Sequence, residues 1–377
     1  MRRVLQVIST TGPGGGETIA VELAAGLARA GWESFVALPG PGWIWDALVS
    51  RGLSPQATPL GGSFDLRYLL KLISLARRLR IDVLHTHFFT PAVYGAVVGR
   101  LTGIPVISTF HGVWDLEESR RFRRVKWGLI RGGTNRLVFV SETLRGQFLT
   151  MNLVPGDRME VVPNGIALEA FSPDRDSGLR QELGLAAETV LVGAVGNVRP
   201  AKGYATFLKA AALLRERHPN FRFVVAGDVA KGLGTELDEL RRSLGLGDTF
   251  RFLGFREDVS RFMRGLDLFV QPSDSEGFSL TVVQALASGL PIVATRSGGP
   301  EEILGGGEHG VLVEPRNPAQ MADAISGLWA DPVRREKFAR QGPALARSRY
   351  DATRMVADYQ RLYARAAGVP RGHAFPG

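Results

Sequence analysis

Short apolar runs recur along the whole chain, and stretches with helical periodicity separate them. In the first half the apolar runs predict strands over residues 4–9, 34–38, 82–87, 106–110, 137–141 and 160–163. Helical patterns lie between them, for example over residues 17–30, 66–80 and 91–101. Because strands that alternate with helices are typical of a parallel sheet, the first half is predicted to be a doubly wound α/β domain.

The second half repeats this pattern. Its apolar runs predict strands over residues 190–196, 221–227, 250–253, 266–271, 291–295 and 311–314. The polar stretch 171–178 contains proline and glycine and is predicted to be a linker, between a domain of residues 1–170 and a domain of residues 179–351. Two such halves that face each other would form a ligand cleft at their strand ends.

The turn that follows the apolar run 266–271 carries the clearest chemistry. Glu276 and Gly277 lie between this strand and an apolar helix, and Ser279 is placed to cap that helix. A helix N-terminus at the carboxyl end of a parallel strand binds anions. Gln284 lies roughly 9 Å from the first turn of this helix, measured along the helix axis. Glu276 and Gln284 are therefore spaced to hold the two ends of a nucleotide-sugar. The alternative is that both are solvated residues.

Two cations mark the end of the strand predicted at residues 190–196. Arg199 and Lys202 stand three residues apart, and Gly203 and a helical pattern follow at once. A forked guanidinium and an ammonium at a helix start suit a diphosphate. The alternative interpretation is a pair of surface cations in a loop.

A glycine-rich loop and two histidine motifs end strands of the first half. The loop 12–17 includes Gly15, Gly16 and Glu17, so its backbone amides are able to approach an anion. It matches neither a phosphate-binding P-loop nor a complete dinucleotide fingerprint, which disfavours a nicotinamide dehydrogenase. His85 and His87 share one face of a strand, and a metal site there would need a third ligand that the sequence does not indicate.

These segments resemble the large retaining glycosyltransferase family 4 (glycosyl transferases group 1). The stretch from Glu276 to Gln284 resembles the family's E-x7-E signature, with glutamine in place of the second acid. Further matches are T-x-H-G at His111, the element that ends in Lys202-Gly203, V-x-P-N-G-I over residues 161–166, and G-G-x-x-E-x-I over residues 297–303. The glycine-rich loop resembles the family's G-G-x-E loop.

The resemblance implies a GT-B fold, in which two Rossmann-like domains with parallel sheets face each other across a cleft. It implies that the first domain binds the acceptor, that the second binds a nucleoside-diphosphate sugar, and that the helix at 352–367 packs back on the first domain. The implied catalytic residues are His111, Arg199, Lys202 and Glu276. The implied donor-binding residues are Gly15, Gly16, Asn197, Asp228, Phe255, Arg256, Gly277, Phe278, Ser279, Leu280 and Gln284. Glu17 and His87 would lie on the acceptor side.

The implied reaction is the transfer of a sugar with retention of configuration, by attack on the same face while the departing phosphate accepts the acceptor's proton. Arg199, Lys202 and the amides after Glu276 would stabilise the leaving diphosphate, so no metal and no other cofactor is expected. The acidic pair Asp174 and Asp176 has the spacing of a manganese motif but lies in the predicted linker. It is therefore interpreted as solvated charge.

The balance of charge points to an anionic surface. The net charge is +9, and residues 120–136 contain seven cations and no acid. Phe122, Val125, Leu129 and Ile130 recur at helical spacing, with Trp127 off that stripe, so the segment is predicted to be a helix that lies on anionic lipid. A lipid-linked glycan acceptor would follow. The alternative is that the stripe packs on the domain's own sheet and the cations are solvated.

Composition sets the remaining expectations. The 377 residues include no cysteine and no apolar run of membrane-spanning length, and the first residues are too short an apolar stretch for a signal peptide. A cytoplasmic enzyme, peripheral on the inner face of a membrane and active in cell-envelope polysaccharide or lipopolysaccharide synthesis, is expected. Three alternatives remain: a nucleotide-sugar epimerase, a donor-binding protein without catalysis, and a nucleic-acid-binding protein, for which no readout module is present.

Overall fold

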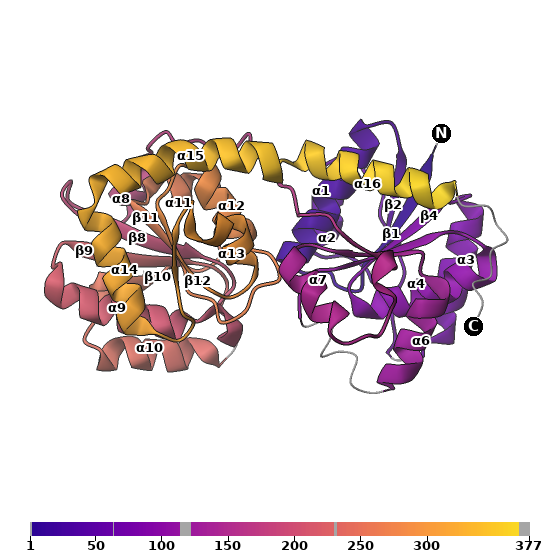
Figure 1. Cartoon of the computed structure of the whole chain (residues 1–377), viewed down its shortest axis with the longest axis horizontal. Helices are drawn as coiled ribbons and strands as arrows, with labels where there is room; N and C mark the ends of the chain where they lie inside the picture. The colour runs from indigo at the N-terminus through magenta and orange to yellow at the C-terminus, as the bar shows by residue number, and fades with distance from the viewer. Residues whose placement is uncertain (1, 63, 114–121, 230–231, 369–377) are drawn as a thin grey trace. The chain divides into compact units, whose positions relative to one another are not determined.

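The computed structural model describes residues 2–62, 64–113, 122–229 and 232–368, which form two compact units. The first unit combines Met1–Ile166 with Asp351–Gly377, and the second is Ala167–Tyr350. Both are parallel α/β units, as predicted (Figure 1). Within the described residues, no helix has the length and apolar character needed to cross a membrane.

The first unit is built on a seven-stranded parallel sheet with the order β3-β2-β1-β4-β5-β6-β7. Its order reverses between β1 and β4, which creates a switch point at the carboxyl ends of these two strands. The strands are β1 (Arg3–Val7), β2 (Glu33–Leu38), β3 (Gln56–Ala57), β4 (Val83–His87), β5 (Val106–Phe110), β6 (Arg136–Phe139) and β7 (Met159–Val161). All the predicted strands are present, and β3 was missed because two residues are too short for a pattern.

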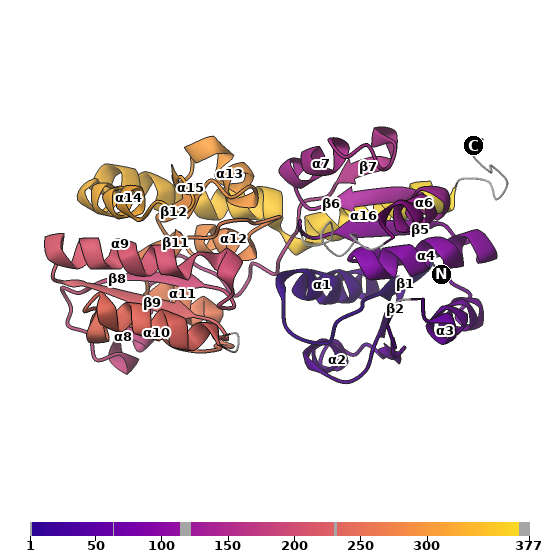
Figure 2. The same ribbon diagram turned by 90° about the horizontal axis from the view of Figure 1, so that it is seen from below.

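Helices cover both faces of this sheet (Figures 1 and 2). One face carries α1 (Gly15–Arg29), α2 (Trp43–Val49) and α16 (Ala352–Ala367), and the other carries α3 (Leu66–Arg78), α4 (Phe89–Thr102), α6 (Arg123–Gly133) and α7 (Glu142–Leu149). The prediction that residues 352–367 pack on the first domain is confirmed, since Val356 lies against Gly26 of α1. Tyr359 and Tyr363 of α16 are fully buried.

The second unit has a six-stranded parallel sheet with the order β10-β9-β8-β11-β12-β13. The strands are β8 (Val190–Val195), β9 (Phe221–Ala226), β10 (Phe250–Phe252), β11 (Leu268–Gln271), β12 (Ile292–Thr295) and β13 (Val311–Val313). One face carries α9 (Tyr204–Arg217), α10 (Leu233–Ser243) and α14 (Pro318–Ala330). The other carries α8 (Gly178–Glu182), α11 (Val259–Gly265), α12 (Leu280–Ala287) and α15 (Pro332–Tyr350), and α13 (Gly299–Ile303) follows β12.

The predicted linker belongs to the second unit, and the N-terminal segment of the first unit ends at Ile166 rather than at residue 170. Asp176 forms an ion pair with Arg264, with Nη2 and Oδ2 3.1 Å apart, and its Oδ1 accepts a hydrogen bond of 2.7 Å from the Gly178 amide. Asp176 is therefore not a solvated charge. A polar, proline-containing stretch resembles a linker, but these side chains find partners that are distant in the sequence.

The apolar stripe predicted for the basic segment is split in the structure, because Ile130 is buried and its other three members are exposed. Residues 120 and 121 lie outside the described residues, and α6 turns Trp127 and Ile130 inward, where they are 2% and 0% exposed. Phe122, Val125 and Leu129 are 51%, 56% and 37% exposed. Aromatic packing explains this choice: the Trp127 ring lies 5.3 Å from the Phe89 ring and 5.8 Å from the Phe148 ring, measured between centroids. Trp127 therefore does not sit at an interface with solvent or lipid.

Candidate functional site

Glu276 lies on the loop between β11 and α12, and the neighbouring loop clamps its backbone. The Glu276 amide donates to the Ser297 carbonyl at 2.8 Å, and the Gly299 amide donates to the Glu276 carbonyl at 2.9 Å. Gly299 has to be glycine, because a Cβ there would lie 2.7 Å from the Cα of Phe278. The segment 297–303 that resembles a family loop therefore serves to brace Glu276.

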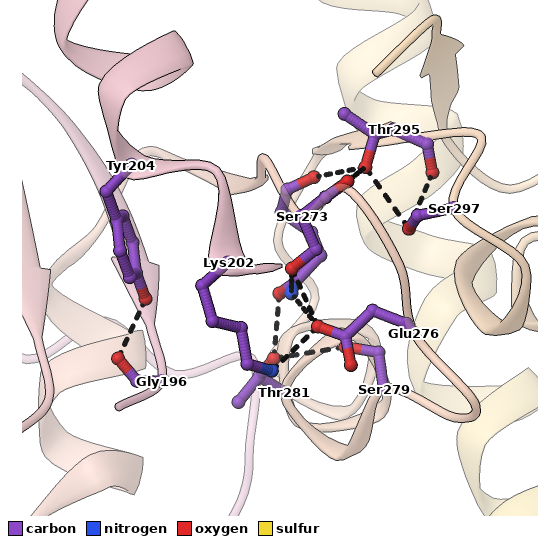
Figure 3. A network of polar contacts seen from close by, with 10 residues as sticks. Gly196, Lys202, Tyr204, Ser273, Glu276, Ser279, Thr281, Thr295 and Ser297 are labelled. Atoms are coloured by element: carbon purple, nitrogen blue, oxygen red, sulfur yellow. Dashed lines mark hydrogen bonds and ion pairs between the residues drawn. The ribbon is translucent and has the colours of Figure 1, made fainter. Parts of the chain in front are cut away.

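Three donors converge on one oxygen of the Glu276 side chain, which is 9% exposed (Figure 3). Oε1 accepts hydrogen bonds from Lys202 Nζ at 2.7 Å, Gln271 Nε2 at 2.8 Å and Ser273 Oγ at 2.7 Å. A carboxylate that is mostly withdrawn from water needs this compensation, because an unpaired buried charge is strongly unfavourable. The three bonds also fix the orientation of the carboxylate before any ligand arrives.

The same network leaves the start of α12 without a side-chain cap. Ser279 stands at the N-cap position, as predicted, but its hydroxyl lies 3.2 Å from Thr281 Oγ1 and does not cap the helix. Thr281 in turn donates to Gln271 Oε1 at 2.9 Å. The predicted residues Gly277, Phe278 and Leu280 complete this turn, whose amides carry the positive end of the helix dipole. An anion is the natural ligand of such a turn.

Lys202 reaches Glu276 from a short 3-10 turn, Pro200–Lys202, between β8 and α9. Gly203 ends that turn with φ +67°, and a Cβ there would lie 1.9 Å from the Pro272 carbonyl oxygen. The two loops thus cross at a place where only glycine fits. Arg199 is exposed on the same turn, so the two predicted cations share one loop, but Lys202 alone contacts Glu276.

Three strand-end loops that the sequence singled out separately come together in this unit. A Cβ on Gly227 would lie 2.1 Å from the Gly196 carbonyl oxygen, and the Gly227 amide donates to the Gly254 carbonyl at 2.8 Å. Tyr204 supports the assembly, because its hydroxyl donates to the Gly196 carbonyl at 2.8 Å. The predicted donor-binding residues Asn197 and Asp228 follow Gly196 and Gly227, and the Asp228 side chain is exposed.

The remaining predicted donor-binding residues are Phe255, Arg256 and Gln284. Phe255 is 52% exposed beside Gly254. Arg256 forms ion pairs with Glu182 at 2.6 Å and with Asp258 at 2.8 Å, so in this structure its guanidinium is paired with protein carboxylates. These two carboxylates raise the pKa of Arg256. Gln284 is half-buried, on the same helix that Glu276 precedes.

The first unit gathers histidines at the carboxyl ends of β4 and β5, where His85 and His87 are fully buried and His111 is half-buried. His87 Nδ1 and His111 Nε2 are 3.1 Å apart, and His87 Nε2 lies 2.9 Å from Gln6 Oε1. Burial lowers the pKa of His111 to about 3, and burial together with the charges of His85 and His111 lowers the pKa of His87 well below its usual range. Both rings are therefore neutral near pH 7, and neither can act as a cation.

The glycine-rich loop packs against His111. A Cβ on Gly16 would lie 2.9 Å from His111 Cγ and 2.7 Å from Phe88 Cζ, so both rings occupy space that glycine leaves open. Phe88 has φ +73°, an uncommon backbone conformation for a bulky residue and one that often marks functional sites. Gly15 opens α1, and Glu17 accepts a hydrogen bond of 2.8 Å from Thr10 Oγ1.

Several residues of these networks were not predicted from the sequence. Gln6 and Gln271 are single polar residues in apolar strands, and that interruption is the signal that could have indicated them. Ser273 and Thr281 flank the Glu276 turn, and nothing in their spacing distinguishes them from ordinary turn residues. Among the described residues, no group of three or more acidic, histidine or cysteine side chains is arranged to hold a metal ion.

Two family models cover most of the chain. Glycosyl transferases group 1 matches residues 177–344, and Glycosyltransferase Family 4 matches residues 13–170. The parallel sheets, the strand-end loops and these matches define a glycosyltransferase of the GT-B class. The chain belongs to glycosyltransferase family 4.

Relatives and solved structures agree with this assignment. D-inositol 3-phosphate glycosyltransferase of Pseudarthrobacter chlorophenolicus is 28% identical over 88% of this chain and 86% of that protein. The same-named protein of Frankia alni is 31% identical over 68% of each chain. The structure of Anabaena HepE in complex with UDP and glucose has a TM-score of 0.85, at 24% identity over 97% of this chain and 100% of that chain. WaaG, a glycosyltransferase involved in lipopolysaccharide biosynthesis, has a TM-score of 0.73 at 18% identity, over 98% of this chain and 100% of that one.

Two glycine substitutions test how the Lys202 loop is held. In Gly203→Ala the new Cβ meets the Pro272 carbonyl, whereas Gly184 has a similar backbone, φ +64°, with nothing within 4 Å of its Cβ position. Gly184→Ala is expected to lower the free energy of unfolding by about 1–2 kcal/mol, the cost of a left-handed residue with a Cβ. Gly203→Ala is expected to lower it further in urea unfolding of the second unit. Equal losses in the two variants would contradict the crossing of the loops.

Proposed function

We propose that this protein transfers a sugar from a nucleoside-diphosphate sugar to a glycan or lipid-linked acceptor, with retention of the anomeric configuration. The observation that carries the proposal is the buried carboxylate of Glu276, bound by Lys202 beside the uncapped start of α12. This arrangement supplies a fixed acceptor for sugar hydroxyls, next to a cation and the N-terminal end of a helix dipole for a diphosphate. Anabaena HepE has been crystallised with UDP and with UDP-glucose, which supports this type of donor.

In the proposed reaction, the bond between the sugar's anomeric carbon and the diphosphate oxygen breaks. A new bond forms on the same face between that carbon and the acceptor oxygen, and the acceptor's hydroxyl proton passes to the departing diphosphate. Negative charge grows on the diphosphate as the bond breaks. Arg199, Lys202 and the α12 amides would stabilise that charge, and electrostatic stabilisation of this kind is usually the largest catalytic effect. His111 would contact the sugar and Gln284 the ribose.

No metal is required in this scheme, because protein cations neutralise the leaving group. The test is sugar transfer in the presence of EDTA, with the product's anomeric configuration read by NMR. We expect a product with the donor's configuration and a rate that EDTA leaves unchanged. An inverted product would refute retention. A loss of activity that manganese restores would refute the metal-free scheme, and release of a free epimerised nucleotide-sugar would identify the alternative, an epimerase.

Substitution of the two loop cations tests their role in the reaction. Arg199→Ala and Lys202→Ala are each expected to lower kcat by roughly 10²-fold or more, since each removes a charge that acts on the leaving diphosphate. Arg199→Ala is the sharper variant, because it leaves the Lys202–Glu276 pair in place. Arg242→Ala, which removes an exposed cation of α10, is the matched control and should keep wild-type kcat. Wild-type kcat in a folded Arg199→Ala variant would rule out this role.

We further propose that the acceptor is reached at an anionic membrane surface, through an apolar rim formed by α3 and α6. The rim consists of exposed residues: Phe64, Leu66 and Leu70 before and on α3, and Phe122, Val125 and Leu129 before and on α6. The Phe64 and Phe122 rings pack edge to face with centroids 5.7 Å apart, so they join the two halves of the rim.

Cations border this rim on both helices. Arg67 and Lys71 alternate with the leucines of α3, and Arg123, Arg124 and Lys126 surround Val125. Arg136, counted earlier in the basic segment, lies instead on β6, where its Nε is 3.1 Å from Glu160 Oε1. Exposed apolar side chains among cations suit anionic lipid, to which each cation contributes on the order of 1 kcal/mol. A role in cell-envelope polysaccharide or lipopolysaccharide synthesis would follow, at the inner face of the membrane.

Liposome co-sedimentation tests the apolar rim. Binding is expected to require anionic lipid and to weaken as salt rises. It should fall in Leu66→Ser/Leu70→Ser and in Arg123→Ser/Arg124→Ser, whereas Val333→Ser, which changes a 78% exposed valine of α15, should bind as wild type does. Binding that ignores lipid charge, or no binding, would contradict the proposal. It would favour a soluble acceptor of the kind in the relatives' name, D-inositol 3-phosphate.

A further inference from the structure

A line of hydrogen bonds runs from the start of α12 to the Glu276 carboxylate, and all of its members belong to the second unit. Gln271, at the end of β11, is 2% exposed, and its Nε2 donates to Glu276 Oε1 at 2.8 Å. Its Oε1 accepts a hydrogen bond of 2.9 Å from Thr281 Oγ1, and Thr281 Oγ1 lies 3.2 Å from Ser279 Oγ (Figure 3). The buried amide of Gln271 thus joins the first turn of α12 to the carboxylate.

The donors and acceptors along this line follow from the chemistry of its members. An ionised carboxylate, here paired with Lys202, only accepts, so the Gln271 amide turns its nitrogen toward Glu276 and its oxygen toward α12. The amide oxygen also only accepts, so Thr281 donates its single hydroxyl proton to Gln271, and Ser279 then donates to Thr281. The Ser279 hydroxyl is therefore engaged with Thr281, which accounts for the missing side-chain cap at the N-terminus of α12.

The two oxygens of the Glu276 carboxylate have different surroundings. Oε1 accepts hydrogen bonds from Lys202, Gln271 and Ser273, at 2.7, 2.8 and 2.7 Å. Oε2 accepts none from the residues that the structure describes, and it is not one of the buried side-chain atoms that lack a partner (Figure 3). Oε2 is therefore the oxygen that remains open to a ligand, and its position depends on the donors that hold Oε1.

We propose that Gln271 and Thr281 are positioning residues for the donor sugar. They hold the Glu276 carboxylate so that the protein fills Oε1 and a hydroxyl of the sugar donates to Oε2. This inference rests on the proposed function, in which Glu276 binds sugar hydroxyls, and it needs residues of the second unit alone. An oxygen that only accepts selects a sugar with a hydroxyl at that place over one with a hydrogen or a carboxylate there.

Paired binding measurements isolate the sugar's share of the affinity. Titration calorimetry gives the Kd of UDP-glucose and of UDP, and of other nucleoside-diphosphate sugars and their diphosphates, and the sugar ratio is the first Kd divided by the second. Thr281→Val removes the hydroxyl that holds Gln271 and is expected to raise the sugar ratio roughly threefold or more, the effect of about one hydrogen bond. Thr281→Ser keeps that hydroxyl and should restore the wild-type ratio. Thr249→Val, a change at a half-buried threonine before β10, is the matched control.

Two substitutions at Gln271 test the direct contact. Gln271→Leu cannot donate, so the sugar ratio is expected to rise roughly tenfold, since the lost bond is to a charged group. Gln271→Glu places a second carboxyl beside Glu276, which raises the pKa of the new group. The protonated group donates to Glu276 and accepts from Thr281, as the amide does. Below that pKa the sugar ratio should approach the wild-type value, and it should rise as the pH increases and the new group ionises.

The groups around the new carboxyl decide how its titration is interpreted. Among the described residues, the charged groups that contact this network are Lys202 and Glu276. Burial and the charge of Glu276 raise the pKa of Tyr204, so its hydroxyl stays neutral over this range. The wild-type amide does not titrate and gives the reference curve in the same pH series.

The outcomes separate this inference from the proposed function. Urea unfolding of each variant shows whether it is folded, and Thr281→Val decides the question if Gln271→Leu does not fold. A wild-type protein that binds none of the sugar donors overturns the proposed function and this inference with it. Sugar donors that bind the wild type, while Thr281→Val and the folded Gln271 variants keep its sugar ratio, overturn this inference alone. A sugar ratio of Gln271→Glu that does not change with pH overturns it as well.

Discussion

The second unit depends on one buried charge. The Glu276 carboxylate is 9% exposed, and it accepts hydrogen bonds from Lys202 on the loop after β8, from Gln271 at the end of β11 and from Ser273 on the loop that follows β11. Removing any of these donors would leave the buried charge partly uncompensated, which would lower the free energy of unfolding. The loops after β8 and β11 must therefore stay together for the unit to fold well. These hydrogen bonds also keep Lys202 and the start of α12 beside the Glu276 carboxylate. The contacts that stabilise the unit therefore also set the geometry of the site.

In the first unit the polar side chains at the strand ends are neutral rather than charged. Its strand ends carry histidines rather than charges, and burial keeps them neutral. Neutral imidazoles still need directed hydrogen bonds, and Gln6, Thr109 and the two tyrosines of α16 supply them. Gly16 leaves space for the His111 ring. In both units the glycines at strand ends matter because they let polar side chains and neighbouring loops approach closely.

Sequence patterns predicted the sheets and most of the strand-end residues, because apolar runs and glycine-containing turns depend on local chemistry. They did not predict which face of α6 is buried. Phe122, Val125, Leu129 and Ile130 fit helical periodicity, but Phe89 and Phe148 come from distant segments and select Trp127 instead. Gln6 and Ser273 were missed for a similar reason, since their importance lies in partners far away in the chain. Arg256 was predicted as a donor contact, but Glu182, another distant residue, binds it in this structure.

The most direct measurement is calorimetric titration of the protein with nucleoside-diphosphate sugars and with the matching nucleoside diphosphates. Wild-type protein is expected to bind a member of each class. Lys202→Met should weaken both classes at least about tenfold, close to 1.4 kcal/mol, because it removes a diphosphate contact. Glu276→Gln should weaken chiefly the sugar-bearing ligand. Binding of neither class by the wild type, or equal affinities in wild type and Lys202→Met, would contradict the claim that the Lys202–Glu276 pair forms the donor site.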